Sequence, residues 1–168
     1  MGNIVLIGFM GCGKSAVGRA LARERALKFV DTDEEVERSA GKRISQIFAE
    51  SGEAEFRRLE REAIGRVAAL DELVIATGGG AVLDPENVRA LKANGRLIWI
   101  DAPAGTLWQR VRRNRDRPLL QRPHPYETLK ALYRERRPIY RAAADASVVS
   151  RGSVYDVAAR IWEVLDGA

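Results

Sequence analysis

The sequence is short of residues on which several classes of protein depend. Cys12 is the single cysteine, so the chain has no internal disulfide bond, and His124, the single histidine, stands among prolines and offers no metal site. No stretch approaches the roughly 20 apolar residues that span a bilayer. The first apolar run follows Met1 almost at once, which leaves no room for a signal peptide. We therefore expect a cytoplasmic protein with no membrane partner.

The overall composition is typical of one folded domain over residues 1–168. Of the 168 residues, 46% are hydrophobic and 30% are charged, which excludes a disordered chain and allows a sizeable core. The net charge of +5 suggests anionic partners. The arginines are spread along several expected helices, however, and no stretch interleaves basic and aromatic residues as a nucleic-acid platform does. We expect small phosphorylated or carboxylated ligands and no nucleic acid.

Residues Gly8–Ser15, with the sequence GFMGCGKS, fit the complete phosphate-loop pattern Gly-x4-Gly-Lys-Ser/Thr. The apolar run Ile4–Ile7 before them predicts a buried strand, and the apolar spacing of Val17 and Leu21 after them predicts a helix. The motif therefore lies at a strand-to-helix turn, where glycines allow backbone N–H groups to converge on a polyphosphate.

Each polar residue of this loop has an expected role. Lys14 should reach the β- and γ-phosphates of ATP, and Ser15 should place its hydroxyl on Mg²⁺. We interpret Cys12 as a small filler of the loop; an alternative is that its thiol is reactive and close enough to the phosphates for its modification to block ATP. The nucleotide contacts expected in the loop are Gly11, Cys12, Gly13, Lys14, Ser15 and Ala16.

Two carboxylates follow the second expected strand, Lys28–Val30. Asp31 and Asp33 would lie at the carboxyl end of a parallel strand, where ligands bind in open α/β sheets. Because they are two apart on a segment taken to be extended, we expect them on the same side, one near Mg²⁺ and the other near a substrate hydroxyl. The alternative is that Asp33 caps the helix that continues through Glu34.

A helix is expected from Ile44 to Leu70, with a break near Gly52. Arg57 and Glu60 are three apart on it and can pair; by spacing alone the pair could be an ordinary solvated one. After a third strand, Leu73–Ala76, come Gly78, Gly79 and Gly80. Three glycines in a row are costly in conformational entropy, so we interpret them as a site of close ligand approach, with a flexible turn as the alternative.

The rest of the chain completes an alternation of strands and helices. Strands are expected at Arg96–Ile100 and Ala146–Val149, and a long helix at 126–144. Between them, the segment at 114–125 is crowded with Arg and Pro and lacks an apolar period, which favours a mobile lid over a plain solvated loop. The alternation predicts an α/β fold with a parallel sheet covered on both faces.

Five short motifs follow the phosphate loop in order: Asp31-Thr32-Asp33, Phe56-Arg57, Gly78-Gly79-Gly80, Arg117-Pro118-Leu119-Leu120 and Arg136-Arg137-Pro138-Ile139-Tyr140. With these motifs, the chain closely resembles the shikimate kinases over nearly its whole length. The resemblance implies a P-loop fold like that of nucleoside-monophosphate kinases: a three-layer α/β/α sandwich with a five-stranded parallel sheet in the order 2-3-1-4-5. It also implies a substrate-binding segment at about 33–61 and a lid at about 112–125.

The resemblance further implies ATP-dependent, Mg²⁺-dependent phosphorylation of the 3-hydroxyl of shikimate, in the pathway to chorismate and the aromatic amino acids. Asp33 would contact the reacting hydroxyl, Arg57 and Arg136 would hold the carboxylate, and Gly78, Gly79 and Gly80 would let the ring approach the backbone. Lys14 and the lid residue Arg117 would meet the transferred phosphoryl group, and Ser15 with Asp31 would serve the metal. Arg110 and Arg151 would lie near the adenine, although the 151–153 turn lacks a proline that the family often has there.

Three alternatives remain open at this level. The chain could phosphorylate another small hydroxy acid such as gluconate, or a nucleoside monophosphate. It could also be a nucleotide-binding module that has lost catalysis. A monomer is expected.

Overall fold

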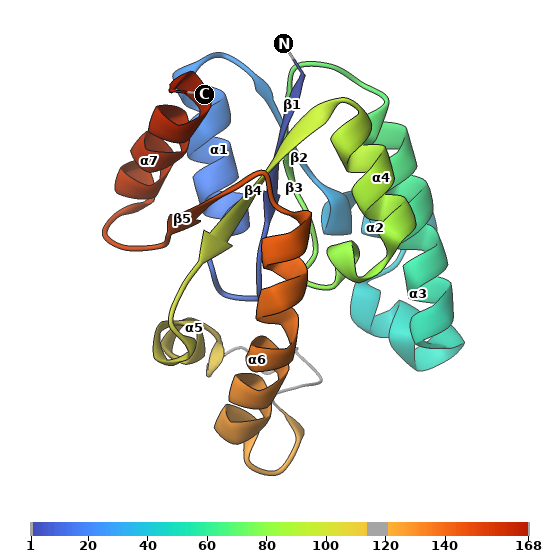
Figure 1. Cartoon of the computed structure of the whole chain (residues 1–168). Helices are drawn as coiled ribbons and strands as arrows, with labels where there is room; N and C mark the ends of the chain where they lie inside the picture. The colour runs from blue at the N-terminus through green and yellow to red at the C-terminus, as the bar shows by residue number, and fades with distance from the viewer. Residues whose placement is uncertain (1, 114–120, 168) are drawn as a thin grey trace.

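The computed structural model describes residues 2–113 and 121–167 of the chain (Figure 1). Within these residues, five strands form one parallel sheet in the order β2-β3-β1-β4-β5. This is the order that the resemblance implied. The strands are β1 (Asn3–Ile7), β2 (Lys28–Asp31), β3 (Leu73–Ala76), β4 (Gly95–Asp101) and β5 (Ala146–Val149).

The most apolar strands occupy the middle of the sheet. Val5 of β1 is in register with Ile75 of β3 on one side and with Leu97 of β4 on the other. Every residue of β1 and of β3 is buried. An unbroken apolar run is what a parallel strand with both faces covered requires, so these strand predictions are confirmed.

Helices cover both faces of the sheet. In Figure 1, α1 and α7 pack together on one face and α3 and α4 on the other, while α5 and α6 extend past the carboxyl ends of the strands. In the described ranges, no helix combines the length and the apolar character that a membrane span needs. The helices are α1 (Lys14–Glu24), α2 (Thr32–Ala40), α3 (Ile44–Ala68), α4 (Pro85–Ala93), α5 (Ala104–Val111), α6 (Pro125–Ala143) and α7 (Val154–Asp166).

The cap of α2 corrects two expectations about the aspartates. Asp31 is the N-cap, and its Oδ1 accepts hydrogen bonds from the backbone N–H groups of Asp33 (2.9 Å) and Glu34 (3.3 Å). The alternative in which Asp33 caps this helix is therefore wrong. Asp33 lies in the first turn of α2 and not on an extended segment, so the argument from strand alternation was also wrong, although both carboxylates line one pocket.

The long helix α3 is bent where the sequence predicted a break. Gly52 has a φ of 83° and a ψ of 174°, which is a left-handed, non-helical conformation. The helical pieces on either side of the bend and α2 share a small apolar cluster that is separate from the main core. This cluster packs α3, the helix that carries Arg57, against α2. Its buried members are Val36, Ile47, Phe56 and Ala63.

Half of the expected lid, residues 114–120, lies outside the described residues. The structure describes no residue from 114 to 120, so Arg117 and the motif around it receive no structural account. On either side of this gap, α5 ends at Val111 and α6 begins at Pro125. His124, just before α6, is exposed.

Candidate active site

The phosphate loop joins β1 to α1 at the carboxyl edge of the sheet (Figure 1). Gly11 and Gly13 have left-handed φ values of 81° and 95°, and a Cβ on Gly11 would lie 2.7 Å from Val111 Cγ1. A larger residue at Gly11 would be strained and would collide with α5, so the shape of the loop depends on glycine there. Because α1 begins at Lys14, its free N–H groups and the positive end of its dipole face the loop, as a phosphate site requires.

Lys14 is held inside this loop. Its Nζ donates hydrogen bonds to the carbonyl oxygens of Gly8 (2.6 Å) and Phe9 (3.0 Å), and it lies 3.5 Å from Cys12 Sγ. The cation is therefore positioned over the centre of the loop. Cys12 is buried, which favours its interpretation as a small filler and argues against a reagent reaching its thiol.

Ser15 and Asp31 meet beside the loop in a way that suits a magnesium ion. Ser15 Oγ donates a 2.6 Å hydrogen bond to Asp31 Oδ2, so two oxygen ligands of the type that Mg²⁺ prefers lie together at the start of α1. Among the described residues, no group of three or more His, Cys, Asp or Glu side chains could hold a metal ion. Ser15 and Asp31 could therefore supply part of a magnesium site, which phosphate oxygens and water would complete.

A pocket of about 260 Å³ opens between the phosphate loop and the triple glycine. It brings together residues that are far apart in the sequence but that lie at the carboxyl ends of β1, β2 and β3. This is the edge of an open α/β sheet where ligands bind. The lining consists of Met10, Gly11, Gly13, Lys14, Ser15, Ala16, Asp31, Asp33, Thr77, Gly78 and Gly79.

Each glycine of the Gly78–Gly80 triplet lies against a different predicted substrate residue. A Cβ on the first glycine would lie 2.8 Å from Asp33 Oδ1, and one on the second would lie 3.7 Å from Arg136 Nη1. A Cβ on the third would lie only 2.6 Å from Arg57 Nη2. A side chain on the first or the third glycine would therefore collide with Asp33 or Arg57, whereas Arg136 lies at ordinary contact distance from the second. One carboxylate and two guanidinium groups converge on this short piece of backbone. This close packing favours the ligand-site interpretation of the triplet over a flexible turn.

The pair between Arg57 and Glu60 is not an ordinary surface pair. Arg57 Nη1 donates a 2.9 Å hydrogen bond to Glu60 Oε1, and the side chain of Glu60 is only 1% exposed. Burial raises the pKa of Glu60 above its usual value, while the positive charge of Arg57 acts in the opposite direction. A buried carboxylate that holds one edge of a guanidinium fixes the direction of the rest of it, so Glu60 orients Arg57 toward the triple glycine.

Arg136 and Tyr140 reach the triplet from α6. The guanidinium carbon of Arg136 lies 5.7 Å from the centre of the Phe9 ring, so this cation sits next to the phosphate loop. The hydroxyl of the buried Tyr140 donates a 2.5 Å hydrogen bond to the carbonyl oxygen of Gly79. Burial also raises the pKa of the Tyr140 hydroxyl, which stays protonated and remains a donor. Tyr140 thus anchors the middle glycine of the site.

Arg110 contacts the outer side of the phosphate loop. Its Nη1 donates hydrogen bonds to the carbonyl oxygen of Gly11 (2.9 Å) and to Ser150 Oγ (3.0 Å), and Ser150 Oγ donates to the carbonyl oxygen of Cys12 (3.1 Å). These contacts place Arg110 beside the nucleotide loop, where an adenine contact is feasible. Arg151 is exposed, and its carbonyl oxygen accepts a 2.6 Å hydrogen bond from Arg160.

Two residues of this site were given no role from the sequence. Tyr140 lies four residues after Arg136 on α6, so the two share a helix face, and this spacing is a signal that could have been used. Ser150 is a buried serine after β5; the neighbouring Arg151 was expected near the adenine, but nothing in the local sequence showed that the Ser150 hydroxyl bonds to the phosphate loop 138 residues away.

Comparisons with known proteins agree with this geometry. The family model described as shikimate kinase matches residues 10–166. A shikimate kinase of Symbiobacterium thermophilum is 51% identical over 166 residues, covering 97% of this chain and 95% of the relative. A second, from Aromatoleum aromaticum, is 46% identical and covers 86% of this chain and 83% of the relative.

Solved structures give the same result. The shikimate kinase of Acinetobacter baumannii in complex with shikimate superposes with a TM-score of 0.95 at 36% identity, covering 99% of this chain and 94% of that one. The shikimate kinase of Aquifex aeolicus gives a TM-score of 0.87 at 39% identity, covering 98% and 96%. The five-stranded sheet order, the phosphate loop and these matches over nearly the whole length lead to one conclusion: the chain belongs to the shikimate kinase family.

Proposed function

We propose that this protein transfers the γ-phosphoryl group of ATP to the 3-hydroxyl of shikimate, giving shikimate 3-phosphate and ADP. The observation that carries the proposal is the convergence of Asp33, Arg57 and Arg136 on the triple glycine, directly beside the phosphate loop. A carboxylate-bearing, hydroxylated ring matches this combination of two cations, one carboxylate and an open stretch of backbone. The A. baumannii relative, whose structure contains shikimate, supports the same substrate.

The nucleotide end of the site would hold ATP by its phosphates. The N–H groups of the loop and the start of α1 would bind the β- and γ-phosphates, with Lys14 between them. Ser15 and Asp31 would hold Mg²⁺, which supplies charge neutralisation to the phosphates when it is bound. Arg110 would lie near the adenine, and Arg151 is proposed for the same region.

The acceptor end would hold shikimate through its carboxylate and its hydroxyls. Guanidinium groups bind carboxylates through two parallel hydrogen bonds, which is why Arg57 and Arg136 are suited to this role. Segment 33–61, which contains α2 and the first part of α3, would form the wall around the ring. Asp33 would accept a hydrogen bond from the 3-hydroxyl and so aim its oxygen at the γ-phosphorus.

The reaction itself asks mainly for alignment. The 3-hydroxyl oxygen forms a bond to the γ-phosphorus while the bond to the β–γ bridging oxygen breaks, and the hydroxyl proton passes to Asp33. Charge that develops on the transferred group would be met by Lys14 and by Arg117 of the lid. The lid, at about 112–125, would exclude water so that ATP is not hydrolysed instead.

Identifying the product by ³¹P NMR tests the proposal. The purified protein is incubated with Mg-ATP and shikimate, and the position of the new phosphate ester is read from its proton couplings. We expect one product, esterified at the 3-hydroxyl. An ester at another hydroxyl, or release of free phosphate without an ester, would contradict the placement of Asp33. Monomeric state and cytoplasmic location stay predictions, which sedimentation and cell fractionation can test.

A further inference from the structure

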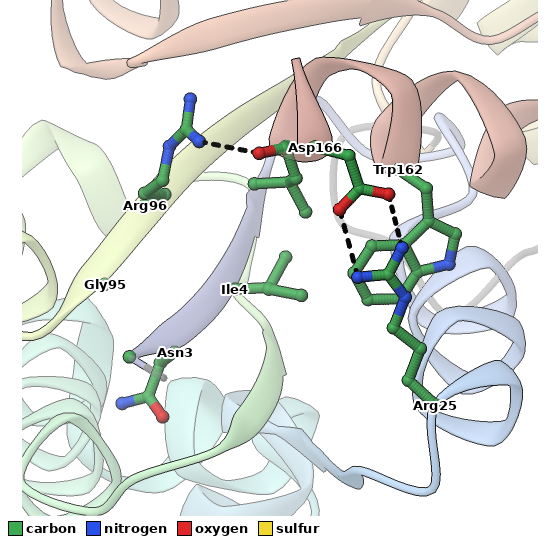
Figure 2. A pocket seen from close by; sticks show the side chains of 9 residues that line it. Asn3, Ile4, Arg25, Gly95, Arg96, Trp162 and Asp166 are labelled. Carbon is green, nitrogen blue, oxygen red and sulfur yellow. Dashed lines mark hydrogen bonds and ion pairs between the residues drawn. The ribbon is translucent and has the colours of Figure 1, made fainter. Parts of the chain in front are cut away.

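A second pocket lies at the opposite edge of the sheet from the phosphate loop (Figure 2). It is bounded by the C-terminal ends of α1 and α7 and by the first residues of β1 and β4. Its volume of about 350 Å³ falls in the range of small-molecule sites. Nothing in the phosphoryl-transfer reaction uses this edge, because the reacting groups all lie at the carboxyl ends of the strands. We call it the N-edge pocket; its lining is Gly2, Asn3, Ile4, Arg25, Gly95, Arg96, Trp162, Leu165 and Asp166.

One wall of the N-edge pocket is apolar and fixed in place. Ile4 and Trp162 are both buried, and Trp162 Nε1 donates a 2.6 Å hydrogen bond to Glu24 Oε2. Arg25 stacks on the Trp162 ring, with its guanidinium carbon 3.7 Å from the ring centre. The same guanidinium makes two parallel hydrogen bonds to Asp166, at 3.0 and 2.5 Å. The charge of Arg25 is thus already neutralised, and its contacts hold the indole rigid.

Arg96 lies on the other side of the pocket and is less strongly paired than Arg25 (Figure 2). Its guanidinium makes one long hydrogen bond, 3.4 Å from Nη1 to the carbonyl oxygen of Leu165. In the part of the chain that the structure describes, no carboxylate oxygen lies within 4.0 Å of it. The C-terminal end of α7 favours a nearby cation, which accounts for an arginine there. The remaining donors of the guanidinium have no hydrogen-bond partner among the described residues, and Arg96 lines the pocket.

We propose that the N-edge pocket binds a small monocarboxylate with an apolar, ring-sized body. The body would occupy the space beside Ile4 and Trp162, and the carboxylate would pair with Arg96. A mostly apolar cavity with a small number of polar groups that fix orientation is the usual design of a small-molecule site. Polyphosphates fit poorly, because they need several donors and, among the described residues, Arg96 is the one guanidinium of the pocket that is not paired with a carboxylate. The site is independent of the proposed kinase reaction.

Binding can be measured by titrating the ¹⁵N-labelled protein with benzoate and with cyclohexanecarboxylate, each paired with its neutral amide. Gly2 and Gly95 line the pocket, and glycine amide signals fall in a sparse region of the spectrum. We expect saturable shifts at these two glycines with the acids and much smaller ones with the amides. Gly11 and Gly13 of the phosphate loop should not move. Shifts centred on the phosphate loop or on Gly78–Gly80, or no saturable shift with either acid, would overturn the proposal.

Two variants locate the contacts. Arg96→Gln should weaken binding of the acids at least about tenfold, which corresponds to about 1.4 kcal/mol, and Leu165→Trp should abolish it by filling the pocket. Arg89→Gln is the matched control, because Arg89 is exposed on α4 and pairs only with Glu86 among the described residues. Circular dichroism and unchanged turnover with ATP and shikimate show that the variants are folded. Undiminished affinity in Arg96→Gln, or equal affinity for acid and amide, would contradict the assigned role of Arg96.

Discussion

Replacing Arg57 by Ala should weaken shikimate binding without affecting ATP. Arg57 points at the triple glycine, and a bidentate guanidinium–carboxylate contact contributes about 1.5–3 kcal/mol. The KM for shikimate should therefore rise about 10- to 150-fold. The KM for ATP should stay within about threefold of the wild-type value, because the hydrogen bonds of Arg57 among the described residues go to Glu60 and Glu53 and not to the phosphate loop. Steady-state assays that vary one substrate at a time give both constants.

The same change should also lower stability, for a separate reason. It leaves the carboxylate of Glu60, 1% exposed, without its cationic partner. Because the Arg57 side chain is itself 27% exposed, we discount the cost to about 1–3 kcal/mol, which lowers Tm by roughly 3–10 °C. Adding Glu60→Gln removes the orphaned charge, so the double variant should recover Tm but not the KM for shikimate.

Arg58 provides the matched control for these variants. It is the next residue on α3, its side chain is 52% exposed, and it pairs with Glu55 and Glu62 at the surface. Arg58→Ala should change neither KM, and Tm should shift only slightly. The reasoning is refuted if Arg57→Ala leaves the KM for shikimate unchanged, if both KM values rise equally, or if Glu60→Gln restores the KM together with Tm.

Three further predictions follow from the site. Lys14→Met should lower kcat about 100- to 1,000-fold, because one charged donor to the transferred group is lost. The circular dichroism spectrum should stay unchanged, and a kcat near the wild-type value would contradict the role of Lys14. Tyr140→Phe should lower the free energy of unfolding by about 1–3 kcal/mol, because the carbonyl oxygen of Gly79 loses its 2.5 Å hydrogen bond; urea denaturation measures it, and no loss would mean that the contact is unimportant. The pKa of Glu60 is raised on folding, so the ionised form of Glu60 costs stability. The favourable contribution of the protonated form is complete below the unfolded pKa of Glu60 and is lost as the pH rises through the folded pKa. Relative to Glu60→Gln, the wild type should therefore lose stability as the pH rises from below the usual glutamate pKa through the raised pKa of the folded state, whereas a difference that stays constant with pH would show that the folded pKa is not raised.

The sheet and the phosphate loop could be predicted from the sequence because their signals are local. An apolar run such as that before Gly8 specifies a buried strand, and the spacing of glycines, lysine and serine specifies the loop that follows. The break at Gly52 was also predicted correctly, since glycine readily adopts the left-handed conformation found there.

The errors and omissions concern contacts between distant segments. The alternative in which Asp33 caps α2 was wrong because the exact residue at which a strand ends is weakly encoded; in the structure Asp31 ends β2 and caps the helix. Spacing predicted that Arg57 and Glu60 pair, but the burial of Glu60 results from its packing against the triple glycine, which sequence spacing does not encode. Ser150 likewise reaches the phosphate loop only in the folded chain.

The rate of ADP release with different acceptors tests the central claim most directly. The purified protein with Mg-ATP is given shikimate, gluconate or a nucleoside monophosphate, and turnover is followed by a coupled assay. The arrangement of Asp33, Arg57 and Arg136 around the triple glycine predicts rapid turnover with shikimate and little with the others. Faster turnover with gluconate or a nucleotide, or ATP binding without turnover on any acceptor, would contradict it.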